Sequence, residues 1–389
     1  MRKLAYLDGL RGIAAMIVVF HHLALMFCPA MVYGEDTASL AKFCSTTPLN
    51  IFYNGDFAVS LFFVLSGYVL SYKYVLLNDP RIIIGYAVKR YFRLMPLIGS
   101  SVIFIVLCIK MDLINTAPLN GYTQVGDWLL GFFKTDATFL QLLENIFYGI
   151  LFFGDNTYNP VVWSMQVEFL GSMLLFAFIL LNHKVKWKWI LFIAALILAV
   201  YYKHYYYMAF LMGYGLCYLN ETNKIKPLPR GLKLLVLLLA IILSSFPASW
   251  LYWKSSMYRV IYFDFSDVVS IYHIAGSTLF LLLTLKHLPA EKFLSLKPIR
   301  FLGKISFPLY LFHIILLILI ANPIFVMCYP HLGYFFSFLV CVIVSLPVLF
   351  GVSYLANRLI DQPALRFANV IEKWFLLKVL RWNGKSKVR

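Results

Sequence analysis

The chain of 389 residues is 62% hydrophobic and only 13% charged, with a mean hydropathy of +0.80. This composition excludes an ordinary soluble domain and is typical of a membrane protein. The net charge of +17 would suggest a nucleic-acid partner in a soluble protein. Here, Lys and Arg lie in short loops between apolar runs, so membrane topology explains them and no nucleic-acid partner is expected. The six cysteines lack CxxC spacing, and we expect no metal site.

Apolar runs of nearly twenty residues recur along the chain, which predicts an all-α, polytopic bundle of membrane helices. A β-barrel would instead show ten-residue alternation. The shorter stretch 139–153 carries Glu144, and we interpret it as a re-entrant or interfacial helix. We predict about ten transmembrane helices, at about 7–27, 57–77, 94–113, 160–182, 189–203, 205–220, 233–250, 267–286, 305–327 and 334–356.

The basic residues predict how these spans are oriented. With a cytoplasmic N-terminus, most of the 34 Lys and Arg residues fall on the cytoplasmic side. We therefore expect a multi-pass protein of the inner or plasma membrane with both termini in the cytoplasm. Residues 1–364 would form the integral membrane domain. Residues 365–389 read as a basic amphipathic tail on the inner leaflet.

The first span contains four ionisable residues, Asp8, Arg11, His21 and His22. Such groups are costly inside a spanning helix and tend to face an interior site. Arg11 and His22 lie about three helical turns apart and share a face, which Asp8 shares as well. Snorkelling at the membrane boundary would account for Asp8 and Arg11. It explains His22 poorly, because His22 lies deep in the second half of the span.

Two further groups of polar residues are candidates for a site. The segment Lys89-Arg90-Tyr91-Phe92-Arg93 precedes the third span, and Arg90 with Arg93 would suit a phosphate at a helix N-terminus. Positive-inside bias alone is the alternative explanation. Glu168 stands alone about two turns into the fourth span. A purely structural salt bridge to Arg11 or Arg93 is the alternative to a catalytic role.

The ninth span places Ser306, Tyr310 and His313 at intervals of four and three residues, on one helical face. Such a stripe is either a hydrogen-bonded packing seam or part of the wall of an active cavity.

Six motifs follow one another over nearly the whole chain: Leu7-Asp8-Gly9-Leu10-Arg11-Gly12 with His22, Phe62-Phe63-Val64-Leu65-Ser66-Gly67, Arg90-Tyr91-Phe92-Arg93-Leu94-Met95-Pro96, Trp163-Ser164-Met165 with Glu168, Ser306-Phe307-Pro308-Leu309-Tyr310-Leu311-Phe312-His313, and Asp361-Gln362-Pro363. Taken together and in this order, they resemble the membrane acyltransferase-3 family. Two departures from the family pattern are Asp361, where Glu is usual, and Phe307, where Tyr is usual.

The resemblance implies that residues 1–364 form an acyltransferase domain that moves an acyl group, usually acetyl, from acetyl-CoA to a hydroxyl. The expected acceptor is an envelope or exported glycan or a lipid-linked sugar, and membrane lipids are further partners. Acyl-CoA would be a donor substrate, and no permanently bound cofactor is expected. Oligomeric state, including a homo-oligomer, stays open. A transporter or flippase is the alternative, although no inverted repeat is visible. A structural membrane scaffold is a third reading.

The family motifs also imply roles for individual residues. We expect His22 to act as general base on the acceptor hydroxyl, with an acyl-imidazole on His22 as the less favoured variant. Glu168, Tyr310 and His313 would orient His22 or the acceptor, or donate hydrogen bonds to the oxyanion. The donor's phosphates would be held by Arg90 and Arg93, with Lys89 and Arg11 assisting.

Overall fold

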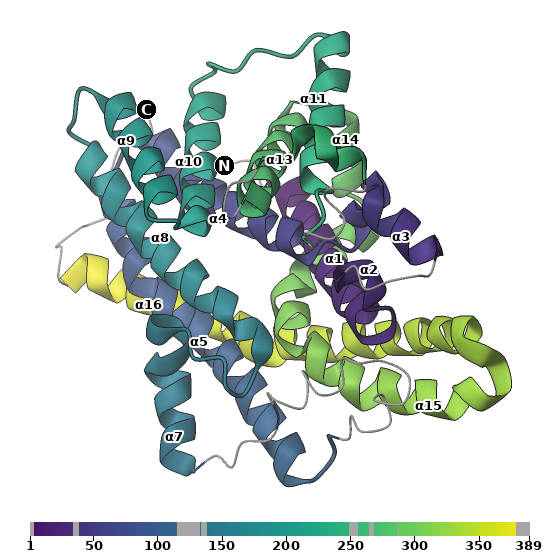
Figure 1. The fold of residues 1–389 in the computed structure, drawn as a ribbon. Helices are drawn as coiled ribbons and strands as arrows, with labels where there is room; N and C mark the ends of the chain where they lie inside the picture. Colours follow the sequence, from purple (N-terminus) through teal and green to yellow (C-terminus); the bar gives the residue numbers. More distant parts are fainter. Residues whose placement is uncertain are drawn as a thin grey trace.

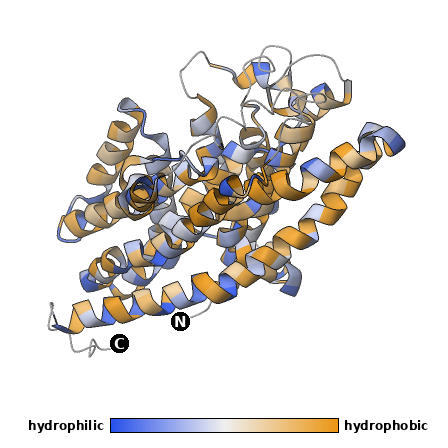
Figure 2. Ribbon diagram, turned by 90° about the horizontal axis from the view of Figure 1, so that it is seen from below, coloured by the Kyte–Doolittle hydropathy of each residue, from blue (hydrophilic) through white to orange (hydrophobic). Residues whose placement is uncertain are grey.

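The computed structural model describes residues 4–33, 39–114, 133, 138–248, 256–263, 268–286 and 288–378. Within these ranges every regular element is helical (Figure 1). Large apolar side chains remain exposed along the helices, and hydrophobic residues predominate along the long helices of the ribbon in Figure 2. The prediction of a helical membrane protein is therefore confirmed. In the part of the chain that the structure describes, six helical segments are long and apolar enough to cross a bilayer: α1 (Ala5–Phe27), α4 (Gly55–Leu77), α5 (Pro80–Lys110), Pro160–Asn182, α13 (Val268–Leu285) and Lys297–Lys378.

The other predicted segments also coincide with helices. The stretch 139–153 folds as α7 (Phe139–Glu144) followed by the π-helix η3 (Asn145–Phe153). Shorter helices occupy three predicted spans: α9 (Lys188–Tyr201), α10 (Tyr205–Glu221) and α11 (Arg230–Ser244). The remaining elements are α2 (Ala30–Tyr33), α3 (Ser39–Thr46), η1 (Pro48–Phe52), η4 (Pro160–Val162), α8 (Trp163–Asn182), η5 (Met257–Ile261), α14 (Leu288–Leu294), α15 (Lys297–Ala356), η6 (Asn357–Asp361) and α16 (Gln362–Lys378).

Helix α5 begins well before the predicted start of the third span. Asp79 caps its N-terminus, accepting a hydrogen bond from the backbone N–H of Arg81, and Pro80 occupies the first turn. Arg90 and Arg93 consequently lie about three turns inside the helix. The expectation that they sit at a helix N-terminus is wrong, because the Asp-Pro cap starts the helix earlier than hydropathy alone indicates.

Helix α15 is a hairpin rather than one straight rod (Figure 1). Gly333 has φ 68° and ψ 179°, which breaks the helical backbone between the two spans predicted at 305–327 and 334–356. The thiol of Cys341 reaches the carbonyl of Ala321 at 3.2 Å, which places the two halves side by side. After the π-turn η6, the chain continues directly into α16, so the predicted boundary between residues 364 and 365 falls inside a helix.

Glycines allow α1 to cross α15 at almost backbone contact. A Cβ on Gly12 would lie 2.4 Å from the backbone N of Gly303, and a Cβ on Gly303 would lie 2.1 Å from the carbonyl oxygen of Asp8. Small residues are what permit such close helix packing in membranes. This crossing brings the polar start of α1 next to the start of α15, where the candidate site lies.

A second close crossing joins α4 to α10 and yields a test of the packing. A Cβ on Gly67 would lie 2.1 Å from the carbonyl oxygen of Phe210, and one on Gly213 would lie 2.1 Å from that of Val64. We expect Gly67→Ala and Gly213→Ala each to lower the free energy of unfolding by about 1–3 kcal/mol, because the backbones must separate. Thermal unfolding in detergent measures this. Gly351→Ala is the matched control, since nothing lies within 4 Å of its Cβ position. Equal stability of all three variants would contradict the packing.

The cap of α5 gives a pH-dependent prediction. Burial opposes ionisation of Asp79, but hydrogen bonds and charge from Arg81 prevail and hold its pKa below the usual value. A carboxylate with a lowered folded-state pKa stabilises the fold above its unfolded-state pKa, and this stability is lost as pH falls through the folded-state value. Asp79→Ala should therefore cost about 1 kcal/mol at neutral pH. The difference from wild type should vanish in acid during a pH series of thermal unfolding. A difference that stays constant down the series would rule out this account.

Candidate active site

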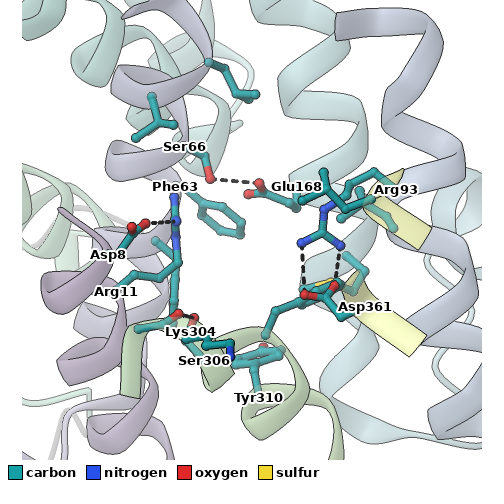
Figure 3. Close-up of a pocket in the computed structure, with 18 of the residues that line it drawn as sticks. Asp8, Arg11, Phe63, Ser66, Arg93, Glu168, Lys304, Ser306, Tyr310 and Asp361 are labelled. Atoms are coloured by element: carbon teal, nitrogen blue, oxygen red, sulfur yellow. Dashed lines mark hydrogen bonds and ion pairs between the residues drawn. The ribbon is translucent and has the colours of Figure 1, made fainter. Parts of the chain in front are cut away.

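A large cavity lies among α1, α4, α5, α8 and the first turns of α15, with the end of η6 and the start of α16 completing its wall (Figure 3). Its volume is about 930 Å³, within the range of small-molecule sites. Eight residues were given catalytic or donor-binding roles from the sequence, and six of them line this cavity: Arg11, Lys89, Arg90, Arg93, Glu168 and Tyr310. The structure thus brings together side chains from helices far apart in the chain.

Glu168 joins three of these helices. It forms an ion pair with Arg90 of α5 and accepts a hydrogen bond from Ser66 Oγ of α4 at 2.8 Å. Arg90 Nε in turn donates to Ser172 Oγ at 3.1 Å. The partner of Glu168 is therefore neither Arg11 nor Arg93, the two cations considered from the sequence. The register of α5 against α8 determines this pairing.

The remaining predicted cations are also paired with carboxylates. Arg93 binds Asp361, which also accepts a hydrogen bond from Asn357 Nδ2 at 3.0 Å. Lys89 lies 2.6 Å from Glu372 on α16. On α1, Arg11 lies 3.5 Å from Asp8, a looser and more exposed pair (Figure 3). All four cations expected to hold a donor's phosphates are thus engaged within the protein.

His22 and His313 do not line the large cavity; they lie behind Tyr310. The rings of Tyr310 and His313 have centroids 5.9 Å apart, and those of His313 and His22 are 4.7 Å apart. The ring of His21 follows at 5.0 Å from that of His22 and borders a second, small cavity with Asp56. A row of aromatic rings therefore connects the two cavities.

Hydrogen bonds fix the tautomers of the two central histidines. His313 Nδ1 lies 2.7 Å from the carbonyl oxygen of Tyr310, which only accepts, so Nδ1 carries the proton and Nε2 is an acceptor. His22 Nδ1 lies 3.0 Å from that Nε2 and 3.0 Å from the carbonyl oxygen of Val18, so it too must be the donor. Neutral His22 therefore presents an unprotonated Nε2, which has no hydrogen-bond partner among the described residues. This is the arrangement that a general base or nucleophile needs.

Comparisons with known proteins show the family to which the chain belongs. A family model described as an acyltransferase domain matches residues 4–352. The chain belongs to the acyltransferase-3 family. A curated relative, acyltransferase clz18 of Cochliobolus lunatus, is 24% identical over 430 aligned positions, which cover 90% of this chain and 89% of the relative. O-acetyltransferase PaAT-1 of Phomopsis amygdali is 26% identical over 211 positions, covering 48% of this chain and 42% of the relative. No solved structure matches.

Asp361 and Phe307, the two residues at which this acyltransferase departs from the family motifs, both contact Arg93. The short side chain of Asp361 reaches Arg93 because η6 is a π-turn that carries this residue at its end. The ring of Phe307 lies 5.5 Å from the Arg93 guanidinium, so a cation–π contact takes the place of any hydroxyl contact. Both substitutions therefore leave Arg93 held in the cavity wall.

Sequence reasoning missed several residues of the acyltransferase site. One of them is Ser164, whose hydroxyl lies 2.7 Å from that of the predicted residue Tyr310; the carbonyl oxygen of Val161 lies within 3.2 Å of both hydroxyls. Lys297, Arg300 and Lys304 line the cavity as well. Their spacing of three and four residues places them on one helical face, and this pattern in the sequence indicates a basic surface at the start of the ninth span.

Proposed function

We propose that this acyltransferase moves an acyl group, acetyl in the first instance, from acyl-CoA to a hydroxyl of a glycan or other envelope or exported acceptor. The observation that carries the proposal is the unprotonated Nε2 of His22, which His313 orients within a row of rings that starts at a cationic cavity. The Phomopsis relative is named an O-acetyltransferase, which supports acetyl as the group and oxygen as the acceptor atom.

The donor and acceptor would approach the histidines from opposite sides. The protein would lie in the cell membrane with both termini cytoplasmic, so that the large cavity opens to the cytoplasm where acyl-CoA is made available. The side chain of Tyr310 would have to rotate for the thioester to pass it and meet the acceptor beside His22. The acceptor hydroxyl would arrive past His21 and Asp56, which border the small cavity.

The proposed chemistry is a direct transfer. As the acceptor oxygen attacks the thioester carbonyl, His22 Nε2 takes the hydroxyl proton. The carbon–sulfur bond then breaks, and the CoA thiolate leaves and receives a proton. The products are the acyl ester and free CoA. The hydroxyls of Tyr310 and Ser164 lie in the cavity wall nearest the histidines, and each would turn its proton from its present acceptor to the oxyanion.

Radiolabelled acetyl-CoA tests the proposal. The purified protein in detergent is incubated with the label and a panel of glycans, lipid-linked sugars and small sugars. Transfer of label to an acceptor with equimolar release of CoA is the expected result. Solute movement across reconstituted vesicles without CoA release would identify a transporter instead. Mass analysis of glycans from cells with and without the protein would then identify the acceptor.

A further inference from the structure

The charges that line the large cavity do not balance. Seven cationic and three acidic side chains of the described residues line it. Four of these cations form ion pairs, with Asp8, Glu168, Asp361 and, outside the lining, Glu372. Among the residues that the structure describes, the other three cations, Lys297, Arg300 and Lys304, have no carboxylate partner. They are the part of the cavity that is left to bind an anion.

These three cations form one surface, which we call the α15 cation face. Spacing of three and four residues places Lys297, Arg300 and Lys304 on the same side of the first two turns of α15. All three are solvent-exposed at the mouth of the cavity. The ammonium nitrogen of Lys304 lies 5.3 Å from the centroid of the Tyr354 ring, a cation–π contact that restrains the lysine side chain. The crossing of Gly12 and Gly303 fixes this surface next to Arg11.

The paired arginines are poor candidates for gripping a ligand. Arg90 and Arg93 have side chains that are only 13% and 23% exposed, and their carboxylate partners are 15% and 5% exposed. An incoming phosphate would have to displace a carboxylate and leave it uncompensated, which is strongly unfavourable in a buried site. The α15 cation face can bind an anion without breaking any carboxylate pair.

We propose that the α15 cation face anchors the phosphates of the acyl-CoA nucleotide, whereas the four paired cations shape the cavity wall. This assignment rests on the proposed function. It leaves the flexible pantetheine arm to extend along the cavity toward Tyr310, because the anchor lies at the mouth. Anionic lipid headgroups offer the same phosphate chemistry, so the test must separate the two sources.

The test measures binding of CoA and of 3′-dephospho-CoA by titration calorimetry, with the full chain in phosphatidylcholine nanodiscs. The variant is Lys297→Gln/Arg300→Gln/Lys304→Gln. The matched control is Lys184→Gln/Lys186→Gln/Lys292→Gln, three exposed lysines that do not line the cavity. Because the replaced side chains are exposed, both variants should keep the wild-type unfolding temperature. A second set of nanodiscs contains phosphatidylglycerol.

Wild type and control should bind CoA more tightly than 3′-dephospho-CoA. The variant should lose about tenfold or more in CoA affinity, together with most of that preference. Unchanged CoA affinity in the variant would overturn the assignment and leave the proposed function standing. A second result would have the same meaning: phosphatidylglycerol raises the unfolding temperature of wild type but not of the variant, while wild type and variant bind CoA equally. The α15 cation face would then bind lipid headgroups. Failure of wild type to bind CoA at all would overturn the proposed function, and this assignment with it.

Discussion

Replacing His22 by alanine is expected to reduce acyl transfer by about 10²–10⁴-fold, the usual contribution of a general base. The reason is local: His22 Nε2 is the unprotonated ring nitrogen that His313 orients, and alanine supplies no substitute. CoA binding should be unchanged, because His22 does not line the large cavity. The measurement is the rate of labelled acetyl transfer at saturating donor, with calorimetric CoA affinity alongside.

A matched control separates loss of chemistry from loss of fold. His204 lies exposed at the junction of α9 and α10, away from the cavity, so His204→Ala should retain full activity. His313→Gln should also slow transfer and should change the pH dependence of the rate, because it alters the partner of His22 Nδ1. Full transfer by His22→Ala would remove the base assigned here.

The second large effect concerns the ion pair between Arg90 and Glu168. Replacing either residue alone by glutamine should lower the free energy of unfolding by about 3–5 kcal/mol, because the partner is left as an uncompensated, nearly buried charge. The double variant Arg90→Gln/Glu168→Gln should lose less than the sum of the two single variants. Chemical or thermal unfolding of the four proteins in detergent gives the coupling energy between the two side chains.

The pair formed by Asp8 and Arg11 is the natural comparison for this cycle. Its atoms are 3.5 Å apart and its side chains are 48% and 27% exposed. Solvent-exposed ion pairs contribute little, so its coupling energy should stay below about 1 kcal/mol. Additive losses at Arg90 and Glu168 would mean that this pair is no more important than the exposed one.

Much of the architecture was predictable because hydropathy is a local property of the chain. Each predicted span overlaps a helix within the described residues, and six of the eight predicted site residues line one cavity, with His22 and His313 outside it. Hydropathy does not predict the start of α5, because the cap formed by Asp79 and Pro80 begins the helix in a segment of mixed polarity. A criterion based on apolar runs places the start of the span only after that segment. The Asp-Pro cap is itself a local pattern in the sequence, and it predicts that Arg90 and Arg93 lie inside a helix.

The partners of the charges were not predictable from the sequence. Arg90, rather than Arg11 or Arg93, binds Glu168, because helix register decides which cation reaches a given carboxylate. The shielding of His22 by Tyr310 depends on the rotation of α15 relative to α1, which the crossing at Gly12 and Gly303 sets. Such relations between distant helices leave no local pattern in the chain.

The central claim is that a thioester enters the large cavity from one side of the membrane and reacts at His22. Sealed vesicles of known protein orientation test it most directly, with acetyl-CoA supplied to one side at a time, a suitable acceptor on the other, and CoA release recorded. Release is predicted only when the donor is on the side of Lys304 and the cavity mouth, and only when His22 is intact. Equal release from the opposite side, or release that persists in His22→Ala vesicles, would contradict the account.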